Sequence, residues 1–145
     1  KFGLEIWREQ MEFTGKCYCG DVQYKASGDP AIKLQCHCRE CQHISGGSAN
    51  VTIGMPEDGF EYTKGAPKQF KRDELETPVI REFCGNCGTQ ILSIADFALP
   101  GVKLIKVGSM DDPSLFTPDM AIFTADKQAF HHIPEGMPAF EGLPG

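Results

Sequence analysis

Apolar and polar residues alternate along much of this chain, which is the pattern of half-buried β-strands. The alternation is clearest at residues 22–26 and 102–107. One short helix is expected over residues 39–44, ended by Ser45-Gly46-Gly47. Further strands are expected at residues 31–36, 48–53, 60–62, 67–70, 79–83 and 90–94. With 16 glycines and 10 prolines spread along the chain, long helices are not expected. The pattern predicts a mainly β fold with short helical turns.

The two ends of the chain depart from this pattern. Residues 1–11 are expected to be an N-terminal extension or a cloning remnant, the alternative being a surface strand or turn added to the domain. Residues 12–145 are expected to form a single domain. The segment 111–145 contains repeated Xaa-Pro turn signals. We expect an irregular, Pro-rich C-terminal tail, held to the domain by the apolar residues Phe116, Ile122, Phe123, Phe130 and Phe140.

Composition and charge narrow the class of protein. No apolar run approaches the roughly 20 residues that a membrane helix needs, and the N-terminus has no apolar core of signal-peptide length. We therefore expect a soluble, cytoplasmic protein without a membrane partner. The formal net charge of −6 would repel phosphate backbones, so a nucleic-acid partner is not expected.

The seven cysteines are the candidate chemistry. They fall in three groups, Cys17-x-Cys19, Cys36-x-Cys38-x-x-Cys41 and Cys84-x-x-Cys87. An odd number at such short spacings favours metal ligation over disulfides. Four thiolates close a tetrahedral zinc site, whereas three leave one position open. Two pairs and one triplet therefore predict two zinc ions per chain, one structural and one reactive, the second more labile because it has fewer ligands.

The two pairs are expected to share the structural zinc. In an extended strand Cys17 and Cys19 would point to the same side. In the turn at Cys84 and Cys87, Gly88 permits unusual backbone angles, and backbone N–H groups can face the sulfurs. The alternative for Cys84 and Cys87 is a redox pair, but no βαβ pattern surrounds them.

The triplet Cys36, Cys38 and Cys41 lies where a strand meets the short helix. Cys41 would sit in the first helical turn, where the helix dipole favours thiolate. An open zinc there could hold a thiol as thiolate or polarise a carbonyl oxygen. The alternative is a closed site with a fourth ligand from His37, His43, His131 or His132. His37 alternates with the cysteines and would face away, and the two tail histidines read as surface or packing residues.

Four basic residues lie near the cysteine groups in the sequence. They are Arg39, Lys71, Arg72 and Arg81. Such residues could bind the carboxylates of an anionic ligand. Taken one at a time, each reads as ordinary solvated surface.

The ordered motifs carry a family resemblance. Gly15-x-Cys17-x-Cys19-Gly20, then Cys36-His37-Cys38-x-x-Cys41, then Phe83-Cys84-x-x-Cys87-Gly88 resemble the glutathione-dependent formaldehyde-activating enzymes, from about Phe13 to the C-terminal region. The resemblance implies a mainly β, Mss4-like zinc-containing fold. It implies a structural zinc at Cys17, Cys19, Cys84 and Cys87 and a catalytic zinc at Cys36, Cys38 and Cys41.

The resemblance also implies an activity. Members join glutathione and formaldehyde to give S-(hydroxymethyl)glutathione, and the reaction is classed as a carbon–sulfur lyase reaction. The expected partners are a small thiol such as glutathione and an aldehyde. The alternative is a non-catalytic thiol carrier or a zinc-stabilised interaction module, as in the centromere protein V-like relatives. A methionine sulfoxide reductase would need a redox cysteine beyond the metal ligands, and all seven are already assigned to metal.

Overall fold

The computed structural model describes residues 10–144, which contain ten strands, one α-helix and four short 3-10 helices. The α-helix within this range is α2 (Arg39–Ser45). In chain order the strands are β1 (Met11–Lys16), β2 (Gln23–Gly28), β3 (Ile32–Cys36), β4 (Asn50–Pro56), β5 (Phe60–Lys64), β6 (Lys68–Phe70), β7 (Ile80–Phe83), β8 (Gln90–Ile94), β9 (Val102–Lys106) and β10 (Met120–Ile122). The mainly β fold expected from the sequence is confirmed.

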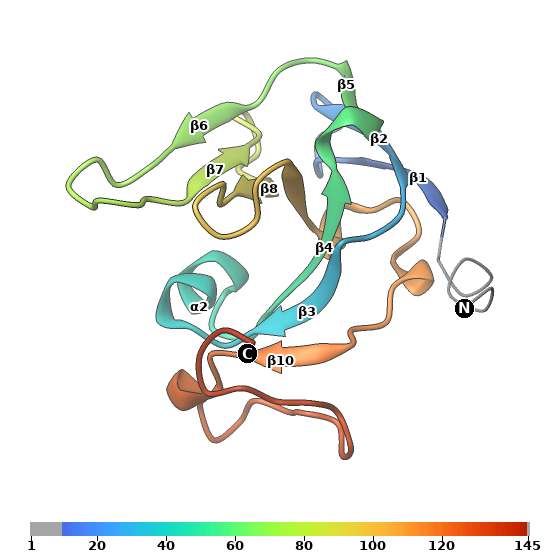
Figure 1. Cartoon of the computed structure of the whole chain (residues 1–145). Helices are drawn as coiled ribbons and strands as arrows, with labels where there is room; N and C mark the ends of the chain where they lie inside the picture. The colour runs from blue at the N-terminus through green and yellow to red at the C-terminus, as the bar shows by residue number, and fades with distance from the viewer. Residues whose placement is uncertain (1–9, 145) are drawn as a thin grey trace.

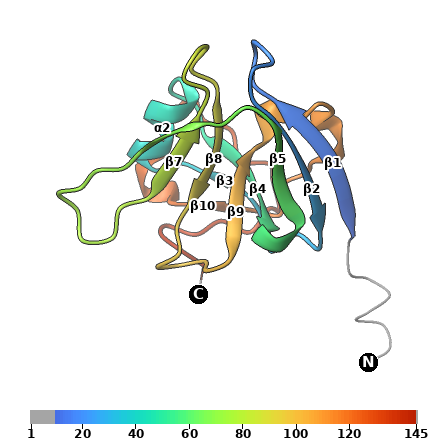
Figure 2. The same cartoon turned by 90° about the horizontal axis from the view of Figure 1, so that it is seen from above.

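The strands form two sheets (Figures 1 and 2). The smaller sheet has the order β1-β2-β5 and is antiparallel. The larger has the order β10-β3-β4-β9-β8-β7-β6 and is antiparallel except where β10 runs parallel to β3. Helix α2 connects β3 to β4. A hairpin turn that contains Cys84 and Cys87 joins β7 to β8.

The main core lies between the two sheets. The smaller sheet contributes the buried side chains of Phe13, Tyr24 and Ala26, and the larger contributes Ile53, Met55 and Ile105. Successive side chains of a strand point to opposite faces. The even-numbered residues of β4 and β9 therefore lie on the other face of the larger sheet, where they line a cleft.

Close backbone approach between β1 and the segment after β9 requires Gly15. A Cβ at this position would lie 2.2 Å from the Tyr24 hydroxyl oxygen and 2.5 Å from the carbonyl oxygen of Ser109. The Tyr24 hydroxyl is hydrogen-bonded to Ser109 Oγ at 2.8 Å, and Gly15 forms an isolated bridge with Met110. A residue with a side chain would push these groups apart.

The tail is mostly irregular, as expected, but it contributes β10 to the larger sheet. Ile122 is buried, and Phe116, Phe123 and Phe140 pack against the buried clusters. The prediction that Phe130 anchors the tail is wrong, because its side chain is 75% exposed. Its ring packs edge-on against that of His131.

The N-terminal part of the chain is described from residue 10 onward. Residues 1–9 of the expected extension lie outside the described residues. Met11 is the first residue of β1 and pairs with Gly28 of β2. Within residues 10–144, no helix is long and apolar enough to cross a membrane.

Candidate metal centres and the adjoining cleft

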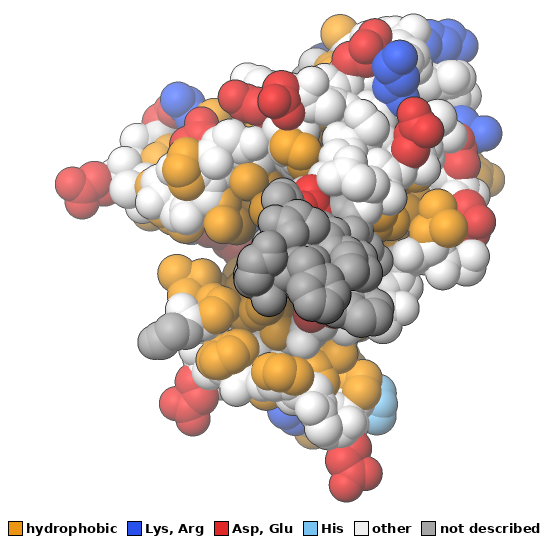
Figure 3. Space-filling model, turned by 45° about the vertical axis from the view of Figure 1, so that its right-hand side comes forward, with side chains coloured by type: hydrophobic (Ala, Val, Ile, Leu, Met, Phe, Trp, Pro, Cys, Tyr) orange, Lys and Arg blue, Asp and Glu red, His pale blue; other side chains and the backbone are white. Residues whose placement is uncertain are grey.

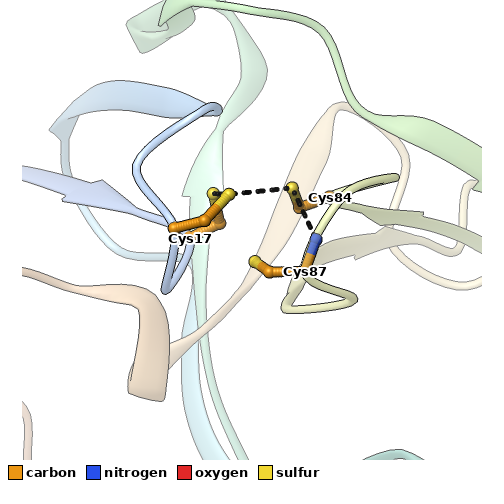
Figure 4. Close-up of side chains that lie close together, drawn as sticks. Cys17, Cys84 and Cys87 are labelled. Atoms are coloured by element: carbon orange, nitrogen blue, oxygen red, sulfur yellow. Dashed lines mark hydrogen bonds between the residues drawn. The ribbon is translucent and has the colours of Figure 1, made fainter.

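The structure brings the two cysteine pairs together. The sulfurs of Cys17, Cys19, Cys84 and Cys87 all lie within 4.8 Å of one another. The first pair follows β1 and the second lies in the turn between β7 and β8, so the quartet joins the smaller sheet to the larger one. Figure 4 shows the side chains of Cys17, Cys84 and Cys87 approaching one another from these two turns.

The first pair lies in a turn, so the expected extended strand at Cys17 and Cys19 is wrong. The amide of Gly20 donates to the carbonyl oxygen of Cys17 at 3.1 Å. Gly20 has a φ of +83° and Gly88, after the second pair, a φ of +82°. Both glycines adopt the left-handed conformation that other residues avoid, and the two turns curl their sulfurs toward a common centre.

Backbone amides face the sulfurs of both pairs. The amide of Val22 donates to Cys17 Sγ at 3.3 Å. The amides of Asn86 and Cys87 donate to Cys84 Sγ at 3.4 Å, as the sequence predicts for this turn. Such bonds stabilise a sulfur in its thiolate form. A hydrogen bond from the Thr89 hydroxyl lowers the pKa of Cys87 to about 5.

The spacing of the quartet fits a zinc ion. Cys17 and Cys19 have their sulfurs 3.7 Å apart, and Cys19 and Cys84 3.8 Å apart. Tetrahedral zinc with Zn–S bonds of about 2.3 Å separates its sulfurs by about 3.8 Å. A donor set of four thiols at these distances could hold a metal ion.

The triplet forms a second group on the other side of the larger sheet. The sulfurs of Cys36, Cys38 and Cys41 lie within 4.8 Å of one another. Cys36 ends β3, and Cys38 is the N-cap of α2, whose sulfur accepts the amide of Cys41 at 3.3 Å. The strand end and the first helical turn thus aim three sulfurs at one point. This group too could hold a metal ion.

Within residues 10–144, no histidine completes the triplet. His37 is fully buried and faces away, as expected, with its Nδ1 2.9 Å from His131 Nδ1. The ring of His43 lies 2.9 Å from the carbonyl oxygen of Arg39. The backbone carbonyl of His132 accepts a hydrogen bond from Gln35. The described residues therefore supply three ligand atoms to this group.

The three triplet thiols share their charge unequally. Hydrogen bonds from Cys36 and Cys38 lower the pKa of Cys41 to about 3, whereas the contacts of Cys36 with Cys38 and then with Cys41 raise the pKa of Cys36. The side-chain amide of Asn50 also donates to Cys41 Sγ at 3.6 Å. Among the three thiols, these contacts therefore favour the thiolate form most at Cys41.

A cleft of about 500 Å³ opens beside the triplet; we call it the cysteine cleft. It extends over one face of the larger sheet, because each strand contributes alternate residues to its floor. These include Leu34 and Cys36 from β3, Asn50 and Thr52 from β4, and Leu104 and Lys106 from β9. Phe97 and Leu143, both more than half exposed, lie at its edge. Figure 3 shows hydrophobic side chains on both walls of a hollow between the tail and the sheets.

Lys106 and Asn50 are residues of this cleft that sequence reasoning missed. Lys106 is buried and donates from Nζ to Ser93 Oγ at 3.1 Å. Burial lowers its pKa to about 8, although the charges of nearby thiolates oppose that shift. The sequence contained a signal for Lys106, because it lies two residues after Leu104 and four after Val102 and so shares a strand face with these apolar residues. A lysine in an apolar register is often functional.

Three of the four basic residues singled out in the sequence gather on one side of α2. Arg39, Arg72 and Arg81 line a second cleft of about 400 Å³. Arg81 is buried and pairs with Glu40 through Nη2 at 2.5 Å. Lys71 does not line this cleft and lies 3.9 Å from Asp73.

Comparisons with known proteins agree with these features. The sequence model of the glutathione-dependent formaldehyde-activating enzyme family matches residues 12–126, a range that holds all seven cysteines. The fold is similar to the crystal structure of a Rhodobacter sphaeroides protein, with a TM-score of 0.56 and 13% identity, over 88% of this chain and 98% of that chain. At this identity the likeness concerns the fold alone. No curated protein matches the chain. Because the family match covers most of its length, this chain belongs to the glutathione-dependent formaldehyde-activating enzyme family.

Proposed function

We propose that this protein is a zinc-dependent carbon–sulfur lyase that forms or cleaves a thiol–aldehyde adduct such as S-(hydroxymethyl)glutathione. The observation that carries the proposal is the triplet, whose three sulfurs converge beside an open cleft. Under this proposal Cys36, Cys38 and Cys41 hold a catalytic zinc. Cys17, Cys19, Cys84 and Cys87 hold a structural one, so a fully loaded chain carries two.

The donor set of the triplet suits this chemistry. Three thiolates satisfy three of the four positions that zinc prefers. A zinc bound there would hold an incoming thiol as thiolate or polarise the aldehyde oxygen. The reaction itself balances without a further reactant: the thiol sulfur bonds to the carbonyl carbon, and the thiol proton ends on the oxygen as a hydroxyl.

Residues of the cysteine cleft support the same reaction. The amide of Asn50 bonds to Cys41 and helps to fix its sulfur. The buried ammonium of Lys106 offsets the negative charge that three thiolates bring together. The apolar walls limit water around the reacting sulfur, which strengthens both electrostatic effects.

The test is the rate at which glutathione and formaldehyde exchange with their adduct. Because the adduct also forms spontaneously, exchange is followed by NMR at equilibrium, with and without the zinc-loaded protein. The Cys38→Ser variant removes one triplet ligand but keeps α2 capped, since serine is a good N-cap residue. We expect the wild type to accelerate exchange and the variant to fall to the spontaneous rate. Equal acceleration by both would contradict the catalytic role of the triplet. Saturable glutathione binding by a wild type that gives no acceleration would instead indicate a thiol carrier.

A further inference from the structure

The cysteine cleft is larger and more apolar than the smallest aldehyde requires. Its volume of about 500 Å³ lies within the range of roughly 300–1,000 Å³ that is usual for small-molecule sites. Ten of its twenty lining residues are apolar, counted without the three cysteines. Formaldehyde has a single carbon and no substituent, so it would leave most of this apolar lining in contact with water. The cleft therefore fits a ligand that has an apolar part of its own.

The floor of the cleft extends away from the triplet along the larger sheet. Cys36 of the triplet pairs with Asn50 of β4. Four residues further along β4, Gly54 pairs with Leu104, and four residues of a strand span about 13 Å. The connection between β8 and β9 adds residues 97–99 to the lining. The floor is thus long enough for a chain of several carbons.

A buried lysine stands between the sulfurs and the apolar part of this floor. Lys106 pairs with Thr52, which lies midway between the two positions of β4 just described. Its side chain faces the cleft and is only 8% exposed. An ammonium has three N–H donors, and one of them is directed to Ser93 Oγ at 3.1 Å. A carbonyl oxygen bound in the cleft can therefore accept a further hydrogen bond from Lys106.

The order of these groups along the sheet matches the order of groups in a thiol–aldehyde adduct. The triplet comes first, Lys106 second and Leu104 third. In the adduct the sulfur comes first, the carbon that carries the oxygen second and the substituent of the aldehyde third. The structure therefore favours the aldehyde, and not the thiol, as the source of the apolar part.

Two large apolar side chains at the edge of the cleft are left exposed. Phe97 is 55% exposed and Leu143 is 59% exposed. They come from the connection between β8 and β9 and from the tail, yet both line this cleft. Exposed apolar side chains that gather at one concavity are typical of a binding site. A bound apolar chain would remove part of their surface from water, which is favourable.

We propose that the cysteine cleft binds the apolar substituent of the aldehyde, so that the protein prefers an aldehyde with a chain of about six carbons, roughly 8 Å when extended, over formaldehyde. This inference rests on the proposed function, because it names the class of aldehyde for the same site. The aldehyde oxygen accepts from Lys106, and the chain lies along Leu104 toward Phe97 and Leu143. In the addition the thiol sulfur bonds to the carbonyl carbon, the π electron pair moves to the oxygen, and the thiol proton ends there.

The first experiment measures binding without any chemistry. Linear amides have the carbonyl group of an aldehyde but do not add thiols. The zinc-loaded protein is titrated with propanamide, butanamide and hexanamide, and binding is followed by NMR. We expect the affinity to rise about 3-fold for each added methylene, because each one leaves water for the apolar lining.

Variants at the edge of the cleft locate the bound chain. Phe97→Ser and Leu143→Ser should each lower the affinity for hexanamide about 3-fold and affect propanamide less. Both side chains are largely exposed, so neither change opens a cavity in the core. Phe130→Ser and Leu115→Ser are the matched controls, since they make the same changes at exposed positions outside the cleft.

A third variant locates the carbonyl group. Lys106→Met should weaken all three amides by a similar factor, because each presents the same carbonyl oxygen, and should leave the gain per methylene unchanged. Lys103→Met, on the same strand but outside the cleft, is the matched control. Unchanged affinities in Lys106→Met would contradict the placement of the oxygen.

Two results would overturn the inference as a whole. One is an affinity that does not rise with the length of the amide. The other is an equal loss in each variant and its matched control, because the changes would then act through the surface in general. Both results concern binding alone and can be read whether or not the protein is a lyase.

A second experiment separates the inference from the proposed function. Adduct exchange of glutathione is measured with formaldehyde and with hexanal. We expect a KM about 10-fold or more lower for hexanal, which Phe97→Ser raises. Acceleration confined to formaldehyde would support the lyase and contradict the inference. Length-dependent amide binding by a protein that accelerates neither exchange would support the role of the cleft and contradict the lyase. A preference for long-chain thiols, with none among aldehydes, would contradict the assignment to the carbonyl partner.

Discussion

At the scale of single residues, Lys106 is the least expected feature of the molecule. Burying an ammonium is costly unless its charge is matched, and the nearby thiols of the triplet provide that match. The effect is reciprocal, because the positive charge of Lys106 also favours the thiolate form of Cys41. The lysine and the triplet are therefore expected to titrate as partners.

Replacing Lys106 by methionine should raise the pKa of the triplet thiols in the metal-free protein. The expected shift is about one pH unit, because a single nearby positive charge is lost. It is measured as the pH midpoint of alkylation by iodoacetamide at Cys36, Cys38 and Cys41, read by mass spectrometry. Lys103→Met is the matched control, since Lys103 is also on β9 but outside the cysteine cleft. An unchanged midpoint in Lys106→Met would show that the two charges do not interact.

At the scale of elements, the buried pair of His37 and His131 attaches the tail to the segments on both sides of α2. His131 Nε2 lies 2.8 Å from the carbonyl oxygen of Gly47 and must donate to it, and His131 Nδ1 accepts the amide of Gln128. His37 Nδ1 must then donate to His131 Nδ1. Both rings are neutral in this arrangement. A proton added to His131 Nδ1 would point at the Nδ1–H of His37.

Because of this histidine pair, we expect the free energy of unfolding to decrease in mild acid. Burial, and then repulsion by His131, lower the pKa of His37 below its ordinary value of 6.5. Below about pH 6.5 the unfolded chain binds a proton that the folded chain resists, so the free energy of unfolding should decrease as pH falls from that value. His37→Asn keeps a donor near the Nδ1 position but cannot titrate. Chemical denaturation between pH 5 and 8 should show that the free energy of unfolding decreases less in this variant than in the wild type as pH falls. If the free energy of unfolding depended on pH in the same way in both proteins, His37 would not be the titrating group. Any loss of metal that is common to both proteins cancels in this comparison.

At the scale of the whole molecule, the quartet ties the two sheets together, whereas the triplet lies at one face of the larger sheet. The two groups should therefore differ in their effect on stability. Cys87→Ser should destabilise the zinc-loaded fold by several kcal/mol, because binding free energy at a structural site is folding free energy. Cys38→Ser should cost about 1 kcal/mol or less. Thermal unfolding of the two variants beside the wild type measures the difference, and a larger loss in Cys38→Ser would reverse the assignment of roles.

Much of the sheet structure was predictable from local patterns. Strands β2, β8 and β9 and helix α2 lie within a residue or two of their expected positions, because alternation and the Gly46 stop are local signals. Strands β1 and β10 were missed. Each depends on a distant partner, β2 and β3 respectively, and β10 lies among turn signals that favour irregular structure.

The cysteine groups were also predictable, since short spacings constrain which sulfurs can meet. The gathering of Arg39, Arg72 and Arg81 was not. It depends on α2 lying beside the segment between β6 and β7, which no local pattern specifies. Phe130 illustrates the opposite error, because an apolar residue in a tail signals burial only on average.

Under the proposed function, two zinc ions have unequal roles and only the triplet supports adduct chemistry. The decisive measurement follows adduct exchange while zinc is added stepwise to metal-free protein. The four-thiol quartet should fill before the three-thiol triplet. We predict little acceleration up to about one equivalent of zinc and a steep rise between one and two. Full acceleration at one equivalent, or none at two, would contradict this division of roles between the two zinc ions.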